Sequence, residues 1–177
     1  EPWGGMDNFV SPGDQGLLKV SLLMGKIPQE AVTTHPVIVQ AVADLVTEAG
    51  GKPVIGDSPG GPFNETMVNR VYNKTGMDTV ADTTEAELNF EFGIENVSYE
   101  AGEVLKNLRL GTFIQSADVI INLPKFKTHG LTKLTGAVKN LFGAVAGLLK
   151  AEYHLNMQEV TDFSNVLLDI AQATAPD

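Results

Sequence analysis

Short apolar segments alternate with amphipathic helical patterns along the first half of the chain, and this alternation constrains the fold more than any other feature. Residues 17–23, 53–56 and 118–123 are apolar runs bounded by turn residues, as in buried strands. Apolar residues at helical spacing follow the first two runs, over residues 36–49 and 64–75. Because strands that alternate with helices usually pair side by side in one direction, the pattern predicts an α/β fold, a mainly parallel sheet with helices on its faces.

The middle of the chain departs from this pattern. Residues 82–103 contain seven acidic residues, and Leu88, Phe90 and Phe92 alternate with polar neighbours. A strand that is buried on both faces would not tolerate so many carboxylates. The segment is therefore predicted to be a β-hairpin-like excursion, outside the main sheet or at its edge. Two more helices are expected after it, over residues 132–149 and 157–173.

Length and ends define the expected domain organisation. The chain has 177 residues, which suits one domain, so we expect a single α/β domain over residues 1–177. It opens with Glu1 instead of methionine and stops at Asp177, directly after a helical pattern. We therefore expect it to be a fragment of a longer protein.

Composition excludes several classes of function. A formal net charge of −10 argues against general binding of nucleic acid or of anionic membranes, and aromatic residues make up only 7% of the chain. No apolar run approaches the roughly 20 residues that cross a bilayer, and no secretory signal pattern opens the chain, so a cytoplasmic location is expected. There is no cysteine, and therefore no disulfide, thiolate metal site or cysteine-ligated cluster in this chain.

A basic island stands out against this acidic background. Residues 119–151 contain no Asp or Glu, yet they hold five of the twelve lysines and arginines. The segment carries a formal charge of +5, which leaves −15 for the rest of a chain whose total is −10. Solvated loops also carry lysines, but here no acidic partner is near in sequence. The density of positive charge predicts a bound anion.

Spacing within the island suggests how its side chains converge. If the chain stays extended after the strand, Lys125, Lys127 and His129 point to one side. In the expected helix over residues 132–149, one stripe begins at the helix N-terminus, where free backbone N–H groups favour anions. This stripe holds Thr132, Thr135 and Lys139, and Asn140 is next to it. For Lys139 and Asn140, the sequence is equally compatible with a role in the site and with a position on the helix surface.

A second strand end supplies further candidates. Asp57 and Ser58 follow the strand at 53–56, and Asp57 is either a base, a metal ligand or a cap of its own turn. Lys150 and His154 are four residues apart and either extend the basic patch or lie on the surface. The three histidines are too far apart in sequence to form a recognisable metal motif, so no metal site is predicted.

These motifs resemble a known family. The segment from Pro124 to Gly143, the strand at 118–123, Thr33-Thr34-His35-Pro36 and Gly56-Asp57-Ser58-Pro59-Gly60 are similar to the bacterial and archaeal family called domain of unknown function 362. The resemblance implies an α/β domain, frequently found in iron–sulfur proteins of anaerobes with ferredoxin-type cysteine motifs elsewhere. It implies no established reaction. Val20 and Ser21 stand where the family tends to have Pro-Asn. Without cysteine here, any [4Fe–4S] cluster would belong to a missing segment or a partner.

Two functions follow from these observations. The first is an enzyme-type domain that binds a small phosphate- or carboxylate-bearing ligand at the carboxyl ends of the strands. In it Lys125, Lys127 and Lys139 neutralise the ligand, His129 acts as general acid or base, and Asp57 assists. The second is a non-catalytic module that docks an acidic partner, such as a ferredoxin-type domain. Lysines that converge on a concave pocket would favour the first function, and lysines spread over a flat surface would favour the second.

Overall fold

A four-stranded parallel sheet forms the centre of the molecule, as the alternation of segments predicts. The computed structural model describes residues 4–175. Leu18 of the central strand pairs with Ile55 on one side and with Ile121 on the other, so its backbone is hydrogen-bonded to both neighbours. In sheet order the strands are β3 (Glu87–Leu88), β2 (Lys52–Gly56), β1 (Gln15–Val20) and β6 (Val119–Leu123).

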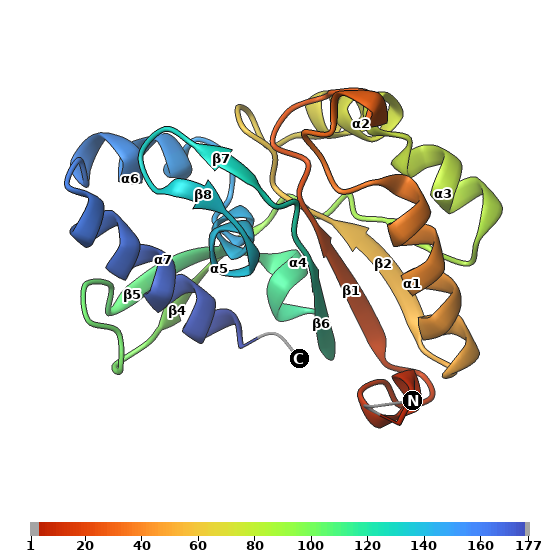
Figure 1. The fold of residues 1–177 in the computed structure, drawn as a ribbon. Helices are drawn as coiled ribbons and strands as arrows, with labels where there is room; N and C mark the ends of the chain where they lie inside the picture. Colours follow the sequence, from red (N-terminus) through yellow and green to blue (C-terminus); the bar gives the residue numbers. More distant parts are fainter. Residues whose placement is uncertain (1–3, 176–177) are drawn as a thin grey trace.

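Helices cover one face of this sheet (Figure 1). His35 accepts the N–H of Val37 and begins the first helix, and Asn64 caps the second in the same way. Each cap satisfies a free backbone N–H of its helix; the cap at Asn64 is as the sequence predicts, whereas the first helix is capped by His35 and not by Thr33 or Thr34. Alternate strand residues such as Leu18 and Ile55 pack against these helices. The helices are α1 (Pro36–Glu48), α2 (Glu65–Thr75) and α3 (Met77–Thr83).

The other face carries a hairpin and the C-terminal helix. Leu17 and Ile120, which point away from the first group of helices, pack with Leu110 and Phe163. The elements on this side are the antiparallel pair β4 (Ile94–Ser98) and β5 (Asn107–Gly111), the short helix α4 (Thr112–Gln115), and α7 (Val160–Thr174). Each sheet face therefore has its own hydrophobic core, built from alternate residues of the same strands.

The acidic middle segment lies where its composition predicts. β3 occupies the edge of the main sheet, and β4 leaves that sheet to pair with β5. The second strand of the hairpin lies after residue 103, beyond the expected excursion. The predicted excursion around residues 82–103 is thus confirmed, although β5, the strand that pairs with β4, lies further along the chain.

One expected helix is wrong. Residues 132–149 do not form a single helix: β7 (Lys127–His129) turns back on β8 (Lys133–Thr135), and three short helices follow, α5 (Ala137–Asn140), η3 (Leu141–Ala144) and α6 (Leu149–Asn156). Glycines explain the breaks, because Gly136 is extended and Gly147 has a positive φ of 53°. No helix N-terminus therefore lies at Thr132. The last helix begins at Val160, three residues later than expected.

Within residues 4–175, no helix is both long enough and apolar enough to cross a bilayer.

Candidate functional site

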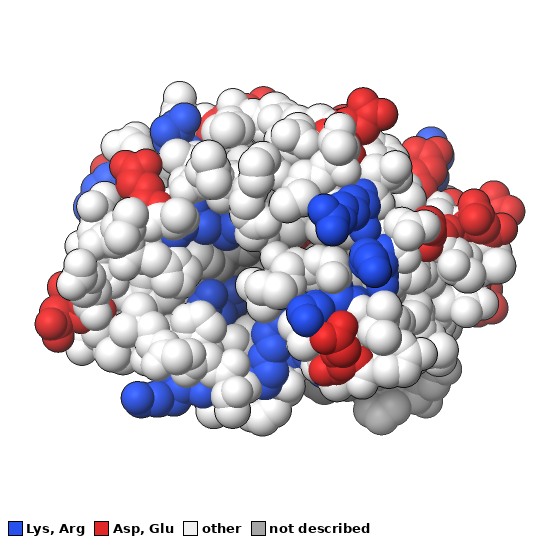
Figure 2. Space-filling model, turned by 90° about the horizontal axis from the view of Figure 1, so that it is seen from above, with Lys and Arg blue, Asp and Glu red and all other residues white. Residues whose placement is uncertain are grey.

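A cavity of about 530 Å³ opens at the carboxyl ends of the parallel strands. Its walls come from the segments after β1 and β2, from β7 and β8, and from α5, η3 and α6. Figure 2 shows this end of the molecule, with basic side chains in and around a hollow and most of the visible acidic side chains nearer the edge. Open parallel sheets place their ligands in this position.

A buried ion pair lies beneath the cavity, and Asp57 of this pair lines it. Lys19 in β1 is fully buried, and its Nζ donates to Asp57 Oδ1 at 2.6 Å and to the Val20 carbonyl at 2.9 Å. The backbone N–H of Leu22 donates to Asp57 Oδ2 at 2.8 Å. Both carboxylate oxygens are thus engaged by the protein, and Asp57 acts as a countercharge for Lys19. The sequence signal for Lys19 is a lysine within an otherwise apolar strand.

Gly143 allows a third segment to approach this pair. Its carbonyl accepts the N–H of Ser58 at 3.2 Å, and a Cβ at this position would collide with Asp57 Oδ1 and Lys19 Nζ.

Gly143→Ala should therefore lower the free energy of unfolding by about 1–3 kcal/mol in urea denaturation, the cost of overpacking a filled interior. Gly130→Ala is the matched control, because nothing lies within 4 Å of the added Cβ. Equal stability of the two variants would contradict the close approach.

Lys127 reaches the cavity from β7. Its Nζ donates to the Val32 carbonyl at 2.6 Å and, more weakly, to Ser21 Oγ at 3.4 Å. Burial lowers the pKa of Lys127, the charge of Lys125 lowers it further, and Asp57 opposes this by raising it. The ammonium is therefore held in place by neutral oxygen atoms.

Lys139 reaches the cavity from α5 and lies beside aromatic rings. Its Nζ is 4.8 Å from the centroid of Phe142 and 5.7 Å from that of Phe163. Burial, followed by repulsion from Lys127, lowers the pKa of Lys139 to about 8. Its ammonium is stabilised by ring faces, an interaction of only about 0.5–2 kcal/mol.

Lys150 in α6 completes the set of cations. Its Nζ donates to Ser58 Oγ and to the Val145 carbonyl, both at 2.8 Å, and the N–H of Gly147 also donates to Ser58 Oγ at 2.8 Å. Burial lowers the pKa of Lys150 to about 7, against an upward contribution from Asp57. The sequence leaves open whether Lys150 extends the basic patch or lies on the surface. The acid-free segment that ends at residue 151 is the signal that includes it.

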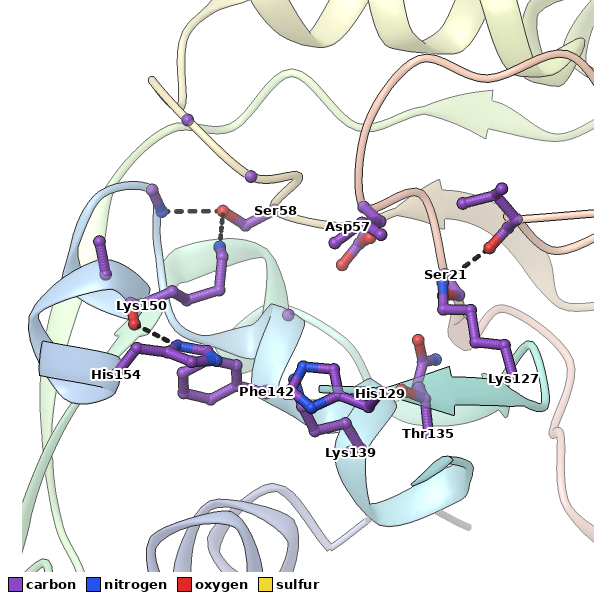
Figure 3. A pocket seen from close by; sticks show the side chains of 18 of the residues that line it. Ser21, Asp57, Ser58, Lys127, His129, Thr135, Lys139, Phe142, Lys150 and His154 are labelled. Carbon is purple, nitrogen blue, oxygen red and sulfur yellow. Dashed lines mark hydrogen bonds between the residues drawn. The ribbon is translucent and has the colours of Figure 1, made fainter. Parts of the chain in front are cut away.

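His129 stands among these lysines (Figure 3). Its Nδ1 accepts the N–H groups of Leu131 at 3.3 Å and Thr132 at 3.2 Å, which assigns the proton of the neutral ring to Nε2. Burial, together with the charge of Lys139, lowers the pKa of His129. The ring centroid of His154 lies 6.1 Å away. Burial and the charge of Lys139 both favour the neutral form of the His129 ring.

Most of the predicted site residues line this one cavity, but two do not. Lys125 lines a separate hollow beside Phe126, in the connection between β6 and β7 that belongs to neither strand. Thr132 is not among the lining residues and contacts His129 through its hydroxyl. The residues that the cavity does bring together are Asp57, Ser58, Lys127, His129, Thr135, Lys139 and Asn140.

Asn140 has a structural task as well as a place in the wall. Its amide donates to the Lys19 carbonyl at 3.0 Å and to Asn122 Oδ1 at 2.8 Å, which ties α5 to the ends of β1 and β6. This explains why a polar residue lies buried between apolar turns.

Ion pairing in the cavity is incomplete. Over residues 4–175 the salt bridges are Lys19–Asp57 and Lys26–Glu30, so none of Lys127, Lys139 and Lys150 contacts a carboxylate. In the same part of the chain, no three His, Asp or Glu side chains lie close enough together to hold a metal ion.

Fold and site together define an α/β protein with a cation-lined pocket at the carboxyl edge of a parallel sheet. Residues 17–177 match the family model described as "Domain of unknown function (DUF362)", and the chain belongs to this family. It is also 40% identical, over 185 aligned residues, to the thylakoid-associated protein sll1697 of Synechocystis sp.. That alignment covers all of this chain and 54% of the relative, so the chain spans about half the relative's length.

Proposed function

We propose that the cavity binds a small anionic ligand that carries a phosphate or carboxylate group. The observation that supports this most strongly is the convergence of Lys127, Lys139 and Lys150, from three different elements, on one cavity without a carboxylate partner. In a chain of net charge −10, many acidic side chains could have neutralised them. A bound anion would supply the missing negative charge.

Burial of the lysines should make binding of such an anion more favourable at this site. Removing an ammonium from water favours its neutral form, and this lowers the pKa values of all three lysines. An anion in the cavity would restore their charge and would gain charge-assisted hydrogen bonds at low effective dielectric. The same residues on a flat, wet surface would gain much less.

His129 is the residue that we propose for proton transfer. Its ring lines the cavity beside Lys139, and the lysine charges lower its pKa, which favours loss of the proton from the imidazolium form. Asp57 is better suited to an indirect role than to that of a free base, because Lys19 and Leu22 occupy both of its oxygens. Its charge raises the pKa values of Lys127, Lys139 and Lys150 and so helps to keep them protonated.

Lys127→Ala and Lys139→Ala should each weaken the binding of phosphate or sulfate by about 1–3 kcal/mol, the scale of a charge-assisted hydrogen bond. Isothermal titration calorimetry would measure the affinities, and thermal melts would check that folding is nearly unchanged. Lys125→Ala is the matched control, because this lysine lines a different hollow. Unchanged anion affinity in both cavity variants would argue against the proposed function.

The competing proposal is a docking module for an acidic partner such as a ferredoxin-type domain. Lys125, Lys133 and the exposed ring of Phe126 lie outside the main cavity and could serve such a surface. The concave arrangement of Lys127, Lys139 and Lys150 supports ligand binding instead. If only Lys125→Ala and Lys133→Ala reduce binding of a reduced or oxidised ferredoxin, and no variant affects small anions, the docking proposal replaces ours.

We propose that any redox role of this protein depends on another segment of a longer chain or on a partner protein. The chain has no cysteine, so its residues do not fit a [4Fe–4S] cluster, and a cluster would have to be ligated by another segment or protein. A cytoplasmic location belongs to the same proposal. The relative named for thylakoid association suggests testing membrane fractions alongside soluble ones when the protein is localised.

A further inference from the structure

Two lysine–serine pairs occupy opposite ends of the cavity. We call Lys127 with Ser21 the first corner, and Lys150 with Ser58 the second corner. Figure 3 shows the first corner at one side of the cavity and the second at the other, with His129 and Phe142 between them. Their elements differ as well, since Lys127 belongs to β7 and Lys150 to α6.

The two corners are built alike. Each ammonium donates to one backbone carbonyl, of Val32 in the first and Val145 in the second. Each also donates to the serine hydroxyl of its own corner, at 3.4 Å in the first and 2.8 Å in the second. An ammonium has three N–H donors, so each corner keeps one donor for a ligand. The neutral acceptors orient both ammonium groups without cancelling their charge.

The space between the corners is larger than one inorganic anion requires. At about 530 Å³ the cavity falls within the roughly 300–1,000 Å³ of pockets that enclose whole small molecules. Apolar side chains, among them Val32, Phe142 and Leu148, line it together with the charged groups. A ligand that fills the cavity would thus meet cations at its two ends, and along its body it would meet these apolar side chains together with Asp57, His129 and Lys139.

We propose that the ligand carries two anionic groups, one held at each corner, with an uncharged body that passes His129. This rests on the proposed function and makes it more specific. Lys139 lies along the body of such a ligand, over Phe142, where it adds positive charge between the two ends. The spacing of the corners then selects the length of the ligand, while either corner alone would bind any small anion.

The test is calorimetric titration with two series of probes. One series contains malonate, succinate, glutarate and adipate, and the other contains the monocarboxylates of the same chain lengths. Wild-type protein should show one optimal length, at which the dicarboxylate binds at least tenfold more tightly than its monocarboxylate. Generic attraction to charge would instead raise the affinity of every dicarboxylate similarly.

Variants then assign the ends. Lys127→Gln and Lys150→Gln should each reduce the tenfold preference to less than about threefold, while the exposed control Lys133→Gln should keep it. Monocarboxylate binding without any length-selective preference for a dicarboxylate would overturn the two-ended ligand and leave the proposed function standing. Failure of wild type to bind any of these probes would overturn the two-ended carboxylate ligand, and failure to bind phosphate and sulfate as well would overturn the proposed function. The wild-type series needs no variant to fold, so the inference remains testable if one corner is needed for stability.

Discussion

Replacing Lys19 with methionine is expected to lower the free energy of unfolding by about 3–5 kcal/mol, because it leaves a carboxylate buried without its counterion. Lys19 is fully buried and Asp57 is only 4% exposed, so neither group can turn to water. Among the described residues, only the N–H of Leu22 would still donate to the carboxylate. Urea denaturation of the variant and of wild type measures the difference.

Two further variants separate the pair from its environment. Lys26→Met removes the exposed lysine that contacts Glu30 at 2.8 Å, and it should cost less than about 1 kcal/mol, as for other surface pairs. Lys19→Met combined with Asp57→Leu removes both charges and should recover part of the loss. A Lys19→Met variant as stable as Lys26→Met would show that the buried pair is not important for the fold.

Affinity for sulfate should fall at least tenfold between pH 6.5 and pH 9. The pKa values of Lys150 and Lys139 are lowered to about 7 and about 8 in the free protein, and a bound anion raises them. Protonated lysines bind the anion, so binding is strongest below the lower value and weakens as pH rises through both. Each proton taken up contributes up to a tenfold loss per pH unit, and sulfate itself does not titrate in this range.

Variants with one titrating lysine removed check the origin of this pH dependence. Lys150→Gln should bind sulfate more weakly at pH 6.5 and should lose affinity less steeply toward pH 9. Lys133→Gln, which lies outside the cavity, should follow wild type at every pH. Affinity that is independent of pH in wild type would mean that these lysines are not neutralised in the free site.

The sequence predicted those parts of the fold that depend on local patterns. Apolar runs located β1, β2 and β6, and apolar residues at helical spacing over residues 36–49 and 64–75 located two helices, because both signals act over a few residues. The expected helix over residues 132–149 failed where Gly136 and Gly147 override apolar spacing. Because this helix does not form, the proposed site has no helix N-terminus. The lysines remain in the site, since β7 and the short helices bring them to the same cavity.

The site was predictable in composition and only partly in geometry. The acid-free segment pointed to Lys127, His129 and Lys139, since charge density does not depend on exact structure. Lys125 was assigned wrongly to the cavity, because its direction depends on where β7 begins. The contact between Lys19 and Asp57 spans 38 residues of sequence, and that between Lys150 and Ser58 spans 92, so sheet topology alone creates them.

Locating a selenate ion crystallographically is the most direct test of the anion-binding cavity. Crystals grown with selenate at low millimolar concentration would show the anion by its anomalous scattering. We predict a selenate within hydrogen-bond distance of the Nζ atom of Lys127, Lys139 or Lys150, and its loss when that lysine is replaced by glutamine. Selenate only at the outer surface, near Lys125 or Lys133, with the cavity free of it, would contradict the account.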